Sequence, residues 1–206
     1  MLIFTVRHGQ TDWNLQERFQ GRTDIPLNQT GMAQARQAGE ILAPFAPIRV
    51  VSSPLIRARA TGRIIAEACG IAWMDVDERL IERDMGSYEG EAIASKPDYF
   101  RRWDANDGSM EPLSQVRDRM RQALCAMQDS GGNVVAVSHG GAINGLLYEV
   151  SQGKVGTGVT RLVNGSVSVF SFHQGELTLL ACNLLPMELK DWGSKHGYPS
   201  GAKAKR

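Results

Sequence analysis

Two short apolar runs that end in similar residues constrain the fold of this chain most strongly. The run LIFTV, residues 2–6, leads to His8 and a glycine, and the run VVAV, residues 134–137, leads to His139 and two glycines. Buried runs of this length are typical of strands in open α/β sheets, where ligands bind at the carboxyl ends. As neighbours in a parallel sheet, the two strands would bring two of the chain's four histidines together at one edge.

Strand and helix patterns alternate along most of the chain. The spacing predicts strands at 2–8, 49–53, 73–80 and 133–139, and helices at 30–42, after Pro54, at 116–128 and at 140–150. Extended runs at 160–163, 166–172 and 177–185, separated by turn residues, predict consecutive strands that complete the sheet edge. The expected fold is therefore α/β, a three-layer α/β/α sandwich with a largely parallel central sheet.

Length and the carboxyl-terminal composition set the domain boundaries. A chain of 206 residues is long enough for one domain with a full hydrophobic core. We expect this single domain to span residues 1–190. Residues 191–206 are basic and rich in small residues, which predicts a flexible tail.

The charge balance excludes several classes of partner. With 23 Lys and Arg against 22 Asp and Glu, the net charge is +1, so no overall field attracts nucleic acid or an anionic membrane. An anion site must therefore be built locally, and a small-molecule partner is expected. The predicted hairpin of residues 166–172 and 177–185 would have an exposed sheet edge. A second copy of the chain could pair with this edge, so a homodimer is one of the expected alternatives.

The cysteines and the amino terminus indicate the cytoplasm. Cys69, Cys125 and Cys182 are odd in number and lack a C-x-x-C spacing, which argues against a disulfide framework and a zinc site. The first apolar run of about five residues is too short for a signal peptide or a membrane span. Asp75 and Asp77 alternate on one predicted strand without a histidine nearby, so they do not indicate a metal site.

An anion site is predicted after the second strand, in the segment SSPLIRARAT. Ser52 or Ser53 would cap a helix, Pro54 would lie in its first turn, and Arg57 would follow one turn later. The helix dipole and the Arg57 guanidinium would both favour a phosphate, and Arg7 could add a second guanidinium. Two arginines and two histidines suit a phosphoryl group.

Glu82, in ERLIERDMGSYEG, is the candidate general acid. The negative charge of a bound phosphate favours the protonated form of a neighbouring carboxylate, which can then protonate a leaving alkoxide. A charge run such as the one at 77–84 is more often a solvated loop. The assignment of Glu82 as general acid therefore depends on the resemblance described next.

The motifs RHGQTDWN followed by RFQG, SSPLIRARAT, ERLIERDMGSYEG and VSHGG, in this order, resemble the histidine phosphatase superfamily, also called the phosphoglycerate mutase-like family. The resemblance covers residues 2–183. It implies the phosphoglycerate mutase-like three-layer fold and a single histidine phosphatase domain over residues 1–190.

The resemblance also implies roles for individual residues. His8 matches the nucleophile that becomes phosphohistidine, and Glu82 matches the proton donor. The phosphate pocket is matched by Arg7, Arg57 and His139. Further substrate-binding positions are matched by Asn14, Gln20, Gly21 and Gly140, and by Arg83, which in related mutases binds a carboxylate or phosphate.

The implied chemistry uses no metal and no cofactor. A neutral His8 attacks phosphorus in line, while the two arginines and a protonated His139 hold the equatorial oxygens. For this, His8 must be held in one tautomer, and a backbone carbonyl is the expected partner.

A phosphatase acting on small phosphate monoesters is the leading hypothesis, and a phosphoglycerate mutase is the main alternative. Met85 stands where the bisphosphoglycerate-dependent mutases carry a tyrosine, which favours the phosphatase. A phosphatase acting on protein phosphohistidine ranks lower. The segment 91–114 is long enough to cap a small-molecule pocket, and such a cap would hinder a protein substrate. A non-catalytic protein that binds a phosphorylated ligand is the alternative from a different class.

Overall fold

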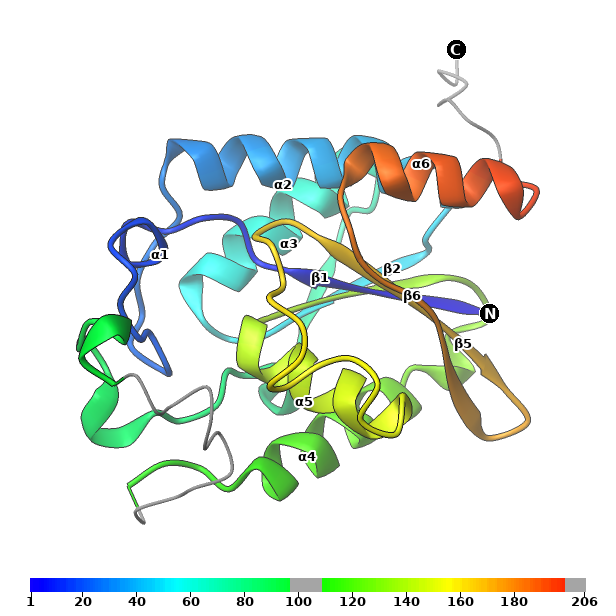
Figure 1. The fold of residues 1–206 in the computed structure, drawn as a ribbon. Coiled ribbons are helices and arrows are strands. Elements are labelled where there is room, and N and C mark those ends of the chain that lie inside the picture. The colour runs from blue at the N-terminus through cyan, green and yellow to red at the C-terminus, as the bar shows by residue number, and fades with distance from the viewer. Residues whose placement is uncertain (97–108, 199–206) are drawn as a thin grey trace.

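A six-stranded mixed sheet forms the middle layer of the structure (Figure 1). The computed structural model describes residues 1–96 and 109–198. The strand order is β3-β2-β4-β1-β5-β6; the first four strands run parallel, β5 runs antiparallel to its neighbours on both sides, and β6 therefore has the direction of the first four. The strands are β1 Leu2–Arg7, β2 Arg49–Ser52, β3 Met74–Val76, β4 Val134–Ser138, β5 Val167–His173 and β6 Glu176–Leu184.

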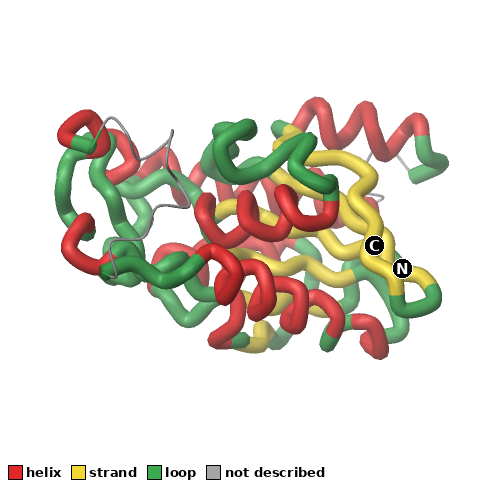
Figure 2. Tube along the Cα trace, turned by 60° about the horizontal axis from the view of Figure 1, so that its bottom comes forward, coloured by secondary structure: helices red, strands yellow, loops and turns green. Residues whose placement is uncertain are grey.

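Helices cover both faces of this sheet, as Figures 1 and 2 show. Helices α2, α3 and α6 pack on one face and helices α4 and α5 on the other, each side with its own cluster of buried apolar residues. The helices are α1 Asp12–Leu15, α2 Gln29–Leu42, α3 Ile56–Ala68, α4 Leu113–Cys125, α5 Gly140–Val150 and α6 Pro186–Lys195. The predicted three-layer α/β/α sandwich is confirmed.

β1 is the central strand of the sheet. It pairs in parallel with β4 on one side and antiparallel with β5 on the other. In the register of the parallel pair, Arg7 lies opposite Ser138, so the histidines that follow each strand leave the sheet at the same level. This arrangement is the predicted one.

The helices carry apolar residues at the spacing that one buried face requires. In α5, Ala142, Ile143 and Leu146 pack against the sheet, at intervals of three and four residues. The first turn of α2 lies unusually close to the loop after β1, because a Cβ on Gly9 would come within 2.2 Å of the Gly31 carbonyl oxygen. Only glycines permit this approach.

One predicted strand does not form. Residues 160–163 have no strand partner, because side chains satisfy their backbone groups. Arg7 donates to the Leu162 carbonyl, and Asn183 accepts from the Val163 N–H at 2.8 Å and donates to the Arg161 carbonyl at 3.3 Å. The predicted strand 73–80 is also shorter, since only 74–76 pair, and Glu78–Leu80 form a 3₁₀ turn.

The carboxyl-terminal segment departs from the prediction as well. The boundary expected at residue 190 falls inside α6, which continues to Lys195. Trp192 and Tyr198 pack against the apolar cluster under α2, with their rings 6.3 Å and 4.9 Å from that of Phe45. The tail therefore does not begin at 191, because these two aromatic side chains supply an apolar face that the basic composition obscures.

Within residues 1–96 and 109–198, no helix combines the length and the apolar composition that crossing a bilayer requires. Half of the segment expected to cap the pocket, residues 97–108 within 91–114, lies outside the described residues. β6 is the outer strand of the late hairpin, and a homodimer through this edge stays a prediction.

Candidate active site

His8 and His139 meet at the carboxyl end of the central strands. Their ring centroids are 5.1 Å apart, and both side chains are buried, with exposed fractions of 2% and 0%. Because β1 and β4 are neighbours in register, the two histidines converge although 131 positions separate them in the sequence. The predicted convergence is confirmed.

The imidazole of His8 is oriented by its own backbone neighbour. Its Nδ1 lies 2.7 Å from the Gly9 carbonyl oxygen, which accepts a hydrogen bond from a protonated Nδ1. Nε2 then carries the lone pair. The backbone of His8 is held as well, because Asn164 donates from Nδ2 to the His8 carbonyl at 3.0 Å. The expected tautomer-fixing carbonyl is thus the one of Gly9.

Two arginines flank the histidines, and of these arginines Arg7 is partly buried and Arg57 fully buried. Arg7 follows from β1 and donates to the Leu162 carbonyl, and burial lowers its pKa to about 10. Arg57 comes from the first turn of α3 and is fully buried; burial lowers the pKa of Arg57 too, opposed mainly by Glu82. Both remain cationic at neutral pH, so the pocket concentrates positive charge.

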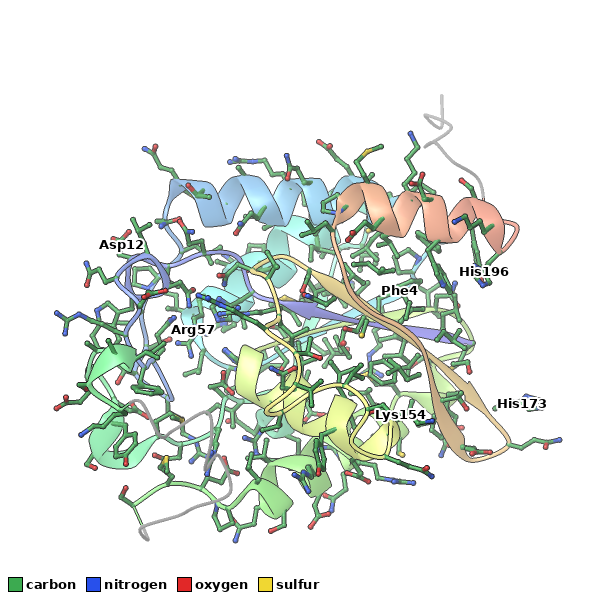
Figure 3. All side chains as sticks on the ribbon, in the orientation of Figure 1. Phe4, Asp12, Arg57, Lys154, His173 and His196 are labelled. Atoms are coloured by element: carbon green, nitrogen blue, oxygen red, sulfur yellow. The ribbon has the colours of Figure 1, made fainter. Side chains whose placement is uncertain are left out.

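Loop carbonyls hold the outer nitrogens of Arg57. Its Nη1 donates to the Thr23 carbonyl at 2.8 Å and its Nη2 to the Gly21 carbonyl at 2.7 Å. Figure 3 shows Arg57 at the end of the sheet where β1 finishes, opposite His173 at the tip of the β5–β6 hairpin.

Three buried nitrogen atoms in this pocket have no protein partner. They are Nε of Arg7, Nε of Arg57 and Nδ1 of His139, none of which makes a hydrogen bond within the described residues. Buried polar atoms are normally paired, and an orphaned set next to two cations suits an anionic ligand with several acceptor oxygens. A phosphoryl group has that character.

His139 is neutral in this arrangement. It lies at the N-cap of α5, and its Nε2 is 2.7 Å from Ser53 Oγ. Burial, with Arg57 and His8 nearby, holds the pKa of His139 well below that of a free imidazole, and burial with Arg57 and Arg7 does the same for His8. These pKa directions describe the site without an anion, and the protonated His139 expected with a bound phosphoryl group stays a prediction.

Lowering the pH from 7.5 to 5 is expected to destabilise the fold. The folded-state pKa values of His8 and His139 lie below that of a free imidazole, so the unfolded chain takes up protons near pH 6.5 that the folded chain does not. Their contribution is fully present above that pH. It falls below it, by at most about 1.4 kcal/mol per pH unit for each histidine. Thermal unfolding between pH 8 and 5 measures this effect.

The control for this titration is a variant in which both histidines are changed to Gln. Its melting temperature should vary much less between pH 6.5 and 5, since His173 and His196 are exposed. A melting temperature of the wild type that stays level or rises over the same window contradicts the prediction.

Glu82 caps the helix that follows His139. Its Oε2 accepts from the Gly141 N–H at 3.0 Å, and its Oε1 accepts from the N–H groups of Ala142 and Arg83, both at 2.8 Å. A Cβ on Gly141 would come within 2.7 Å of Oε1, so a glycine is needed for the carboxyl group to sit this close. The helix dipole at this end favours a negative charge.

The start of α3 differs from the prediction. The helix begins at Ile56 with Leu55 as N-cap, and neither Ser52 nor Ser53 caps it. Its first N–H, that of Ile56, donates to Asp24 Oδ1 at 2.6 Å instead. This helix terminus is thus already occupied by a carboxylate, and the anion-binding contribution of α3 reduces to the Arg57 side chain.

Asn14 and Gln20 present amide groups from the loop around α1. The Asn14 Oδ1 accepts from Asn164 Nδ2 at 3.1 Å, and the Gln20 Oε1 accepts from Thr11 Oγ1 at 3.0 Å. Neither amide nitrogen donates to a residue of the described ranges. Both side chains therefore keep N–H donors for a ligand, as their predicted role requires.

The remaining predicted positions contribute in other ways. Gly21, with φ +50°, offers its carbonyl to Arg57 rather than a donor to a ligand. Gly140 makes room for Arg7, whose Nε would be 3.3 Å from a Cβ there. Arg83 is buried and donates from Nε to the Glu111 carbonyl at 2.8 Å; its binding of a substrate anion stays a prediction.

Two supporting residues were missed by the sequence reasoning. Thr61 accepts from the Gly9 N–H at 3.1 Å and donates to the Arg57 carbonyl at 2.8 Å, so it connects the loop after His8 to the first turns of α3. Its spacing of four residues from Arg57 could have indicated that both face the same way. The sequence placed Asn164 in a turn, but it contained no pattern that indicates a contact with His8.

A fold of this type with histidines, arginines and a carboxylate at the end of its parallel strands defines a phosphoryl-transfer protein. Among the described residues, no three His, Cys, Asp or Glu side chains gather in a way that could hold a metal ion. The model of the histidine phosphatase superfamily (branch 1) matches residues 3–185. The chain belongs to this superfamily.

Known relatives agree on a phosphatase or mutase. The uncharacterized phosphatase PhoE from Bacillus subtilis is 41% identical over 174 residues, which cover 84% of this chain and 89% of that protein. Phosphoglycerate mutase-like protein 4 from Arabidopsis thaliana is 35% identical over 187 residues, with coverages of 84% and 80%. The structure of a mycobacterial glucosyl-3-phosphoglycerate phosphatase with VO3 superimposes with a TM-score of 0.78 and 29% identity, over 88% of this chain and 98% of that one.

Proposed function

We propose that this protein hydrolyses small phosphate monoesters through a phosphohistidine on His8. The observation that carries the proposal is the orientation of His8. With Nδ1 donating to the Gly9 carbonyl, the Nε2 lone pair remains for attack, beside orphaned donors of Arg7 and Arg57. A neutral imidazole held in this way is a nucleophile, and the arginines supply the charge that a phosphoryl group requires.

In the first half-reaction, Nε2 of His8 attacks phosphorus. The Nε2–P bond forms while the bond between phosphorus and the ester oxygen breaks, and Glu82 gives its proton to the leaving oxygen. Arg7, Arg57 and His139 hold the three equatorial oxygens, with Asn14 and Gln20 as further donors. The incoming phosphate charge favours the protonated carboxyl group that this step needs.

In the second half-reaction, water replaces the alcohol. The Glu82 carboxylate takes a proton from the attacking water, the Nε2–P bond breaks, and inorganic phosphate leaves. Glu82 is then protonated again and His8 is again neutral, so each turnover restores the starting state.

The proposed reaction needs neither a metal ion nor a cofactor. Two guanidinium groups supply the positive charge that metal ions provide in other phosphoryl-transfer sites. The proposed substrate is a small phosphorylated metabolite, and the near-zero net charge does not favour nucleic acid or a membrane. Three free cysteines in the folded chain suit the reducing cytoplasm.

A phosphoglycerate mutase is the second candidate, and the Arabidopsis relative is named a phosphoglycerate mutase-like protein. Met85 favours the hydrolase. Its side chain is buried in a small apolar cluster with Phe19 and Met110, so this position offers a ligand no hydroxyl group. A mutase must also hold the phosphohistidine against water, whereas the proposed reaction admits water.

The test is a panel of phosphate esters assayed in excess chelator, with phosphoglycerate isomerisation followed in parallel. We expect phosphate release that the chelator does not change and that is faster than isomerisation. Isomerisation faster than release would identify a mutase. Phosphate binding without turnover of any ester would identify a binding protein, and activity only on phosphorylated protein would overturn the small-molecule substrate.

A further inference from the structure

Arg119 of α4 holds the backbone of the segment that carries Glu82. Its Nη1 donates to the Arg79 carbonyl at 2.8 Å and to the Ile81 carbonyl at 2.5 Å, and its Nη2 donates to the Glu82 carbonyl at 3.1 Å. The side chain is mostly buried, with an exposed fraction of 15%. One guanidinium thus binds three carbonyls of the four-residue stretch that ends at the proposed proton donor.

Glu111 fixes the guanidinium of Arg119 in turn. Nε of Arg119 lies 2.8 Å from Glu111 Oε1 and Nη2 lies 2.9 Å from Oε2, which is a two-point contact of planar groups. The Glu111 backbone also contacts the residues after Glu82: its N–H donates to the Asp84 carbonyl at 3.0 Å, and its carbonyl accepts from the side-chain Nε of Arg83 at 2.8 Å. The pair is therefore a rigid support.

The Glu82 segment depends on such side chains because it has no strand partner. Residues 79–82 run from the 3₁₀ turn into extended backbone outside the sheet. The Leu80 carbonyl is bound by Ser138 Oγ at 2.7 Å, and Arg119 binds the other three. Side chains thus replace the hydrogen-bond ladder that would hold a strand.

We propose that Arg119, held by Glu111, is a positioning residue that sets the carboxyl group of Glu82 against the leaving oxygen of the substrate. The inference rests on the proposed function, in which Glu82 is the proton donor. The N–H groups at the start of α5 fix the Glu82 side chain, and Arg119 fixes its backbone. Proton transfer requires hydrogen-bond reach, and a displacement of about 1 Å can cost on the order of 10²-fold in rate.

Two esters with different leaving groups test this inference. An alkyl phosphate needs its leaving oxygen protonated, whereas p-nitrophenyl phosphate releases a stable phenolate and needs little help. Glu82→Gln should lower kcat on the alkyl ester by on the order of 10²-fold and much less on the aryl ester. Arg119→Ala should follow the same pattern with a loss of about tenfold or more, and Arg119→Lys should recover part of it.

A double variant separates positioning from general damage. Once Glu82→Gln has removed the proton donor, adding Arg119→Ala should cause little further loss on the alkyl ester. Inhibition by inorganic phosphate should stay within a few-fold in Arg119→Ala, because Arg7 and Arg57 are untouched. Arg121→Ala is the matched control on the same helix, since Arg121 pairs with Glu149 and should leave both esters unaffected.

The outcomes distinguish the inference from the proposed function. Equal losses on both esters in Arg119→Ala, or additive losses in the double variant, overturn the positioning role while Glu82 keeps its own. A Glu82→Gln variant without leaving-group dependence overturns the proton donor, and the inference with it. If Arg119→Ala does not fold, Arg119→Lys and Glu111→Gln give the same comparison.

Discussion

His8→Ala is expected to abolish phosphate release, with kcat lowered on the order of 10⁴-fold or more. The variant loses the only atom proposed to bond to phosphorus, Nε2, which the Nδ1 contact with Gly9 leaves available. Steady-state release and an alkaline quench with labelled ester measure the loss. Alkali preserves the N–P bond of phosphohistidine, so the wild type should retain label on the protein and the variant should retain none.

His173→Ala is the matched control for that experiment. His173 ends β5 and is exposed at the far end of the molecule from Arg57, so its loss should leave release unchanged (Figure 3). His8→Ala should still bind inorganic phosphate, because both arginines remain. Label retained on the His8→Ala protein, or release at the wild-type rate, would refute the phosphohistidine mechanism.

Arg57→Ala is expected to lower kcat/KM on the order of 10³-fold and to weaken inhibition by inorganic phosphate. Removing one preorganised donor from an anion site costs about 10²- to 10³-fold, and Arg57 supplies a full charge as well as the orphaned Nε. Kinetics on the best ester and phosphate inhibition measure both effects. Arg57→Lys should recover little, because the three N–H donors of an ammonium leave from one nitrogen and cannot reproduce the spacing of Nη1, Nη2 and Nε in the planar guanidinium.

Stability should change much less than activity in Arg57→Ala. The carbonyls of Gly21 and Thr23 lose their donor, which destabilises the fold, but a cation whose pKa burial has lowered is also removed, which stabilises it. Arg63→Ala, an exposed arginine on the same helix, is the control for both measurements. A variant that unfolds, or one with unchanged phosphate inhibition, would contradict this role for Arg57.

Local patterns carried most of the fold prediction. The apolar runs at β1 and β4 and the helical spacing of α5 depend on neighbours within a few residues, so their positions could be predicted closely. The prediction of a strand at 160–163 failed, because the side chains of Arg7 and Asn183, which are distant in sequence, bind the backbone groups of this segment.

In the candidate site, too, local patterns could be predicted and contacts between distant residues could not. His8, His139 and Glu82 were predicted because they fall at strand ends or within recognisable motifs. The cap on α3 comes from Asp24, which lies 32 residues before Ile56, and no local pattern reveals such a contact. Burial and a nearby guanidinium lower the pKa of His139 in the site without an anion, and neither influence is visible in a sequence.

The central place of β1 has a consequence for how the protein is made. β1 leaves the ribosome before the other strands of this sheet, yet its partners are β4 and β5, which are synthesised more than 130 residues later. Contacts of such long range form late and make folding slow. A nascent chain therefore cannot bring His8 and His139 together until β4 has emerged, and it has to keep the apolar strand β1 unpaired until then.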